Sequence, residues 1–86
     1  MTNQIILQKA IEKAVKNGYQ FDTLYWTQSM LKEGASEHII FSHDFAEAFW
    51  GEKPKGMEEQ YEGYWKDQLQ IMVLEKDPLQ YLEKFL

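Results

Sequence analysis

Short runs of apolar residues at helical spacing follow one another along most of this chain. In residues 3–17, apolar side chains recur every three or four positions, while lysines and a glutamate occupy the rest of the helical circle. Asn17 and Gly18 follow directly, and such a pair is a typical left-handed end of a helix. The sequence therefore opens with a predicted amphipathic helix.

The next segment, residues 19–41, is ambiguous between helix and strand. Asp22 or Thr23 can cap a helix that runs to about Glu33, but the stretch YQFDTLYWT is also rich in the aromatic residues that favour strands. The run HIIF is too short for its period to separate an extended segment from a helical turn. A helix and a short strand pair are therefore both compatible with this part of the sequence.

Ser42 is a good N-cap, and Gly51 can end the helix that would follow it. In this helix Phe45 and Phe49 lie on one apolar stripe together with Ala48. We expect both phenylalanines and the adjacent tryptophan to be buried in the core.

Two more helices are predicted after a loop at residues 51–56. The longer one spans 57–76, and its end LQIMVL is apolar nearly all round, so we expect that end to be the most buried. Its predicted core-facing residues are Met57, Tyr61, Tyr64, Trp65, Met72 and Val73. Asp77 and Pro78 then supply an N-cap and a first helical residue for a short last helix. Its predicted apolar side consists of Leu79, Leu82 and Phe85.

A chain of 86 residues forms one small domain, so every large apolar side chain counts toward its stability. There is no cysteine, which excludes disulfides and thiolate metal sites and suits a reducing compartment. No apolar run approaches the roughly 18 residues of a membrane span. We therefore expect a single mainly α domain, residues 1–86, of four to five short helices, located in the cytoplasm and not in a membrane.

The charged residues narrow the choice of partner. All nine basic residues are lysines, so the arginine side chain that best grips phosphates and guanine edges is missing, which argues against a nucleic-acid partner. Residues 1–43 hold four lysines and four acids, whereas residues 44–86 hold five lysines and ten acids. The net charge of −5 therefore belongs to the second half, which favours a partner with a basic surface.

The stretch HIIFSHDFAEAFWG raises the question of a metal or catalytic site. His43 and Glu47 share a helix face, and Asp44 or His38 could add a third ligand. An acid–base pair of His43 and Asp44 is less suitable, because adjacent helical residues point about 100° apart. The simpler interpretation is that Asp44 complements the positive end of the helix. With no nucleophile elbow, phosphate loop or HExxH motif, we expect no catalysis and no cofactor.

The acidic run at residues 52–62 is the strongest candidate for a binding site. Glu58, Glu59 and Glu62 could dock a basic protein surface, with Trp65 or Tyr61 as an aromatic anchor inside a charged rim. The alternative is a solvated helix start, where negative charge is also favourable. A second copy of the chain could instead cover surplus aromatic residues, so a homodimer stays open.

The segment IIFSHDFAEAFWGE, residues 39–52, resembles a family of small uncharacterised proteins encoded by phages and prophages of low-GC Gram-positive bacteria. Residues 65–86 are similar to the C-terminal pattern of this family, and KAIEKAVKNGY to its opening helix. Relatives tend to have Lys in place of Glu47 and often His in place of Gln68, which weakens a metal site.

The resemblance implies a phage setting, in which small acidic proteins without enzymatic motifs commonly bind a host or phage protein. We therefore expect a small acidic interaction protein of the host-cell cytoplasm that binds such a partner through its acidic C-terminal half. The alternative is a metal-dependent or acid–base enzyme centred on His43 and Asp44.

Overall fold

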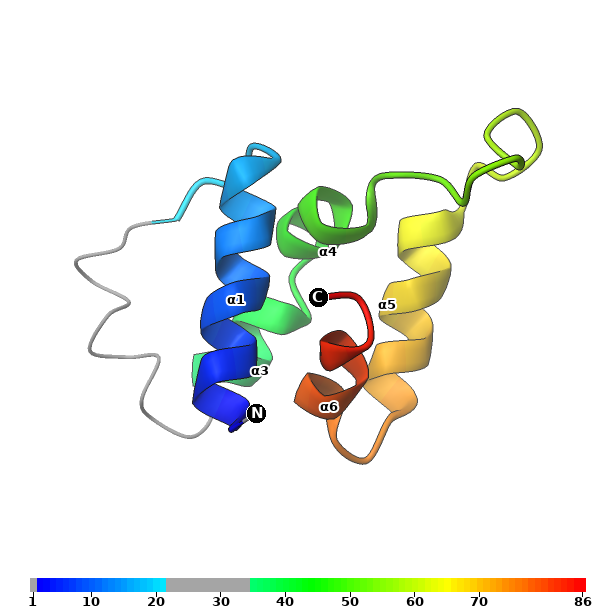
Figure 1. Cartoon of the computed structure of the whole chain (residues 1–86). Coiled ribbons are helices and arrows are strands. Elements are labelled where there is room, and N and C mark those ends of the chain that lie inside the picture. The colour runs from blue at the N-terminus through cyan, green and yellow to red at the C-terminus, as the bar shows by residue number, and fades with distance from the viewer. Residues whose placement is uncertain (1, 22–34) are drawn as a thin grey trace.

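The computed structural model describes residues 2–21 and 35–86. Within these residues the chain forms helices and no strand (Figure 1), which confirms the predicted mainly α fold. The helices are α1 (Asn3–Lys16), α3 (Ala35–Ile40), α4 (His43–Trp50), α5 (Tyr64–Leu74) and α6 (Pro78–Glu83). The predicted helix from Asp22 or Thr23 to Glu33 lies outside the described residues. In the described part of the ambiguous segment, residues 35–40 are helical and form no strand pair.

Helix α1 ends as its sequence predicts. Gly18 has a φ of +106°, a left-handed conformation that glycine adopts without steric cost. Its N–H donates to the carbonyl of Val15 at 3.0 Å, and the N–H of Tyr19 donates to that of Ala14 at 2.9 Å. These two bonds satisfy carbonyls that the helix end would otherwise leave unpaired.

Ser42 joins α3 to α4. Its Oγ accepts a hydrogen bond from the N–H of Phe45 at 3.2 Å, which caps α4, and its hydroxyl donates to the carbonyl of Ile39 at 2.9 Å, near the end of α3. The run HIIF therefore belongs largely to α3 and is not extended. The predicted cap is confirmed, and Gly51 follows the last residue of α4.

Helix α5 is shorter than predicted at both ends. Residues 57–61 form one isolated turn, in which the N–H of Tyr61 donates to the carbonyl of Met57 at 3.0 Å. The helix starts only after Gly63, which provides no side-chain cap. A glycine inside a helix costs about 1 kcal/mol relative to alanine, so Gly63 disfavours a helix that continues through it. It stops before Glu75, whose backbone is extended.

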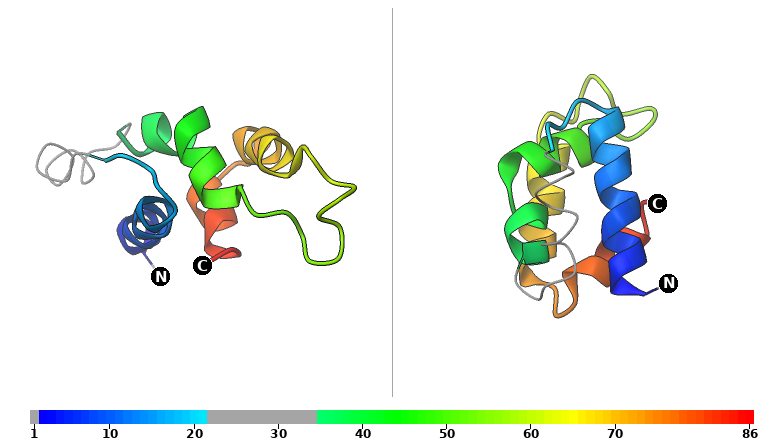
Figure 2. Two further views of the ribbon diagram at one scale, coloured as in Figure 1. Left: turned by 90° about the horizontal axis from the view of Figure 1, so that it is seen from above. Right: turned by 90° about the vertical axis from the view of Figure 1, so that its left-hand side faces the viewer.

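The prediction that the LQIMVL end would be the most buried is wrong. Leu69 and Met72 are buried, but Ile71, Val73 and Leu74 are 44%, 49% and 87% exposed. Helix α5 packs against α4 and α6, and it lies at the side of the molecule away from α1 (Figure 2). Its other side therefore faces solvent. For this reason Val73 is not in the core. Met57 lies outside α5, on the connection before it, and is also exposed.

The start and the two buried leucines of the last helix are confirmed, whereas Phe85, predicted on the same side, lies beyond the end of α6 and is half-buried. The Asp77 carboxylate accepts a hydrogen bond from the N–H of Gln80 at 3.3 Å, and Pro78 occupies the first helical position. Leu79 and Leu82 are buried. The short helix thus closes one end of the core with its two leucines.

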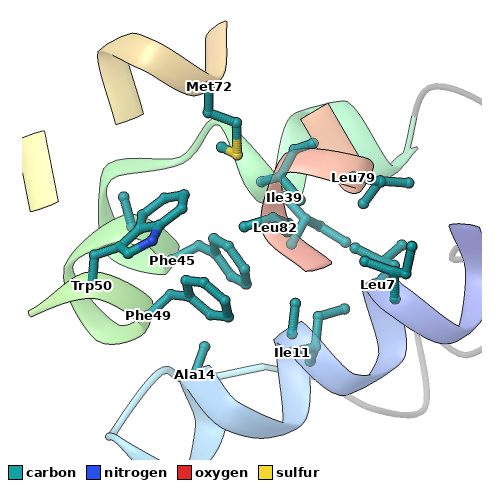
Figure 3. Packing of buried hydrophobic residues seen from close by; sticks show 14 of the residues in the cluster. Leu7, Ile11, Ala14, Ile39, Phe45, Phe49, Trp50, Met72, Leu79 and Leu82 are labelled. Carbon is teal, nitrogen blue, oxygen red and sulfur yellow. The ribbon is translucent and has the colours of Figure 1, made fainter. Parts of the chain in front are cut away.

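The core lies between α1, α4 and α6, and α3 and α5 add Ile39, Ile40, Leu69 and Met72 to it (Figure 3). Phe45, Phe49 and Trp50 of α4 are all at least 97% buried, as expected from the sequence. The rings of Phe45 and Phe49 stack at 5.5 Å, and Trp50 meets Phe49 edge to face at 4.9 Å. Such aromatic pairs add about 0.5–1.5 kcal/mol each beyond the burial of their area. Among the helices that the structure describes, none combines the length and apolar character needed to span a membrane.

Candidate functional site

The connection between α4 and α5, residues 51–63, is here named the acidic loop. It protrudes beyond the ends of both helices, at the upper right of Figure 1. Gly56, with a φ of +85°, allows a tight turn that the N–H of Met57 closes on the carbonyl of Pro54 at 3.1 Å. The loop exposes the side chains of its glutamates to solvent: Glu52, Glu58, Glu59 and Glu62.

A side-chain hydrogen bond holds the end of the acidic loop against α5. The hydroxyl of Tyr61 donates to the carboxylate of Asp67 at 2.5 Å, and its ring packs edge to face on that of Tyr64 at 5.8 Å. The hydrogen bond to Asp67 raises the pKa of the Tyr61 hydroxyl above its ordinary value of 10.0, because ionisation would remove the donor and place two negative charges together. The end of the loop is thus anchored to the first turn of α5.

Trp65, in the first turn of α5, is half-buried beside the start of α4. Its ring meets that of His43 edge to face at 5.9 Å, and the ammonium of Lys66 lies 5.6 Å from its centre. Both contacts fix the indole at the base of the acidic loop. The predicted site residues Glu58, Glu59, Glu62 and Trp65 therefore lie on one protruding connection and the helical turn that follows it.

The structure does not assemble the residues of the alternative metal site. Within residues 2–21 and 35–86, no three histidine and acidic side chains are placed to hold a metal ion. A cleft of about 540 Å³ beside α4 is lined by Asp44 and Glu47 with the turn at 17–20, but His43 is not part of its lining. His43 packs on Trp65 instead. The proposed acid and base of an enzyme therefore do not share a cavity.

A second cleft, of about 440 Å³, was not predicted from the sequence. It lies between the second half of α1, the end of α4, residues 52–54, Tyr64 and Phe85. Because three lysines line it, we name it the lysine cleft. Its lining is Lys13, Lys16, Asn17, Phe49, Trp50, Glu52, Lys53, Pro54, Tyr64 and Phe85. The spacing of lysines on α1 was a partial signal, but only folding brings residues 53 and 85 beside them.

The case for a function depends on the geometry and charge of these surfaces. No protein-family model, curated protein or solved structure matches the chain.

Proposed function

We propose that this protein binds another protein, one with a basic surface, through the acidic loop and Trp65, and that it does so without catalysis. One observation carries the proposal: the glutamates of the loop are exposed on a connection that protrudes from the helices. The resemblance of residues 39–52 to phage and prophage proteins supports a host or phage protein as the partner.

The chemistry of the loop suits such a contact. Residues 57–63 contain three glutamates and no lysine, so their carboxylates attract a basic surface over a distance of about the Debye length, 8–10 Å at ordinary salt. Trp65 supplies an aromatic side chain, the residue type most often responsible for binding energy at interfaces. The bond from Tyr61 to Asp67 holds one end of the loop before binding, which lowers the entropy cost of ordering it.

The test is capture of partners from host-cell lysate with a tagged protein and with Glu58, Glu59 and Glu62 replaced by Lys. The matched control replaces Glu12, Glu47 and Glu75 by Lys, because these glutamates are also exposed and lie outside the loop. We expect one stoichiometric partner that the native protein and the control retain and the loop variant loses. Its binding should also weaken with salt. A partner that both variants retain would contradict the proposed binding face. A partner that both variants lose would show that binding depends on the net charge of the protein and not on the acidic loop.

A further inference from the structure

We propose that the lysine cleft binds a small organic anion with an aromatic body. This site does not include Glu58, Glu59 or Glu62 of the acidic loop, and lysines outnumber carboxylates in its lining. Its volume of about 440 Å³ falls within the range of about 300–1,000 Å³ that is typical of small-molecule sites.

The positive charge of the cleft comes from two segments far apart in the sequence. Lys13 and Lys16 belong to α1, Lys53 to the acidic loop, and Glu52 is the one carboxylate side chain in the lining. The negative end of the α1 dipole would by itself favour lysines in the last turn of that helix. The helix dipole does not explain Lys53, which belongs to the acidic loop and lines the same cleft.

Lys13 is held in place as a fixed charge. Its ammonium donates a hydrogen bond to the carbonyl of Phe85 at 3.0 Å and lies 4.4 Å from the centre of the Phe49 ring. An ammonium fixed by these contacts needs little reorganisation to face an anion. Lys16 and Lys53 have exposed side chains, so their ammonium groups can close on a ligand from either side.

Aromatic side chains form the other wall of the cleft. Phe49, Trp50, Tyr64 and Phe85 all belong to the lining, and the rings of Trp50 and Phe85 meet edge to face at 5.7 Å. The half-buried rings of Tyr64 and Phe85 offer flat surface to an aromatic ligand, since aromatic pairs are favourable in stacked and edge-to-face geometry. A wall of this kind selects an anion with an aromatic body over a bare inorganic one.

Trp50, one of the residues that line the cleft, carries a hydrogen-bond donor without a partner. The side chain is 2% exposed, and its Nε1 has no hydrogen-bond partner in the described part of the protein. Buried donors are nearly always paired, and one left unpaired is unfavourable. A sulfonate, carboxylate or phosphate oxygen that reached Nε1 would supply the missing acceptor.

The experiment is a fluorescence titration with 8-anilinonaphthalene-1-sulfonate, an aromatic anion. The test variant carries Lys16→Gln and Lys53→Gln, and the matched control carries Lys9→Gln and Lys55→Gln, two exposed lysines that do not line the cleft. We expect Kd to rise at least about tenfold in the test variant, because two charge-assisted contacts are lost, and less than about threefold in the control. Equal weakening in both variants, or no binding by the native protein, would overturn the proposal.

Two further readouts place the ligand and define its class. The indole N–H resonance of Trp50 should shift on titration of the native protein and of the control, and stay in place in the Lys16→Gln, Lys53→Gln variant. Inorganic phosphate at the same concentrations should leave the aromatic anion bound. Displacement by phosphate would show that the ligand needs no aromatic body. An unmoved Trp50 resonance would show that the probe binds outside the lysine cleft. Unchanged circular dichroism of the variants confirms that they fold, as expected for exposed lysines.

Discussion

At the scale of single residues, one hydroxyl serves two helices. Ser42 caps α4 through Phe45 and also donates to Ile39 of α3, so it fixes the angle at which the chain turns between them. This dual role explains why a stretch with two histidines and two acids need not be a site. Its polar residues mark the start of a helix whose phenylalanines and tryptophan fill the core.

Replacing Ser42 by Ala should therefore lower the free energy of unfolding by about 1–2 kcal/mol. The loss of an N-cap accounts for about 1 kcal/mol. The loss of the hydroxyl bond to the carbonyl of Ile39 accounts for the remainder, although this carbonyl keeps its bond from the backbone N–H of residue 42. Thermal or urea denaturation measures the change, with the exposed Gln70→Ala as the control. A stable Ser42→Ala variant that had lost zinc binding would contradict the structural role and restore the metal hypothesis.

The contact between Tyr61 and Asp67 predicts a pH dependence. Since the pKa of Tyr61 is raised above 10.0 in the folded protein, the bond stabilises the fold fully below pH 10, and this contribution is lost as the pH rises through the raised pKa. Asp67→Ala should return the pKa of Tyr61 toward 10.0. A ¹³C NMR titration of the tyrosine ring carbons follows this value directly.

Tyr81 provides an internal control for that titration. Its pKa is also raised, but by burial first and then by Tyr64 and Glu75, so Asp67→Ala should leave it in place. A parallel fall of both pKa values would show that the substitution loosens the fold and does not act through one hydrogen bond.

At the scale of helices, the features predicted well from the sequence are the helix ends, which depend on local signals. Gly18, Ser42 and Asp77 act on backbone groups within a few residues of themselves, so their effect can be inferred without knowing the fold. The burial of α5 cannot be inferred in this way, because it depends on which helices pack against it. Helix α5 packs against α4 and α6, and the apolar residues that it turns away from them are exposed to solvent.

This one-sided packing gives a paired prediction on α5. Met72→Ala should destabilise the protein by about 2–5 kcal/mol, since the side chain is fully buried and its loss leaves a cavity. Leu74→Ala, two residues away and 87% exposed, should change stability by less than about 0.5 kcal/mol. Urea denaturation of the two variants compares them directly. Similar losses for both would mean that Leu74 is covered in solution, for example by a second copy of the chain.

At the scale of the whole molecule, the acidic loop contributes to two surfaces of opposite charge. Residues 52–54 line the lysine cleft, while the glutamates at 58, 59 and 62 are exposed farther along the loop. The acidic site could be proposed from the sequence because its residues lie close together along the chain. The cleft could not be predicted in this way, because Lys13, Lys53 and Phe85 are neighbours only after α1, the acidic loop and the C-terminal segment pack together.

This arrangement predicts weak and salt-dependent coupling between the two proposed sites. Replacing Glu58, Glu59 and Glu62 by Lys should tighten the binding of 8-anilinonaphthalene-1-sulfonate at low salt, because it removes negative charge that repels the anion. At about 1 M salt, where the Debye length is about 3 Å, the loop variant and the native protein should bind equally. Titrations at several salt concentrations measure the effect. A loop variant that lost the anion would show that the acidic loop shapes the cleft, so the two surfaces would then form one site.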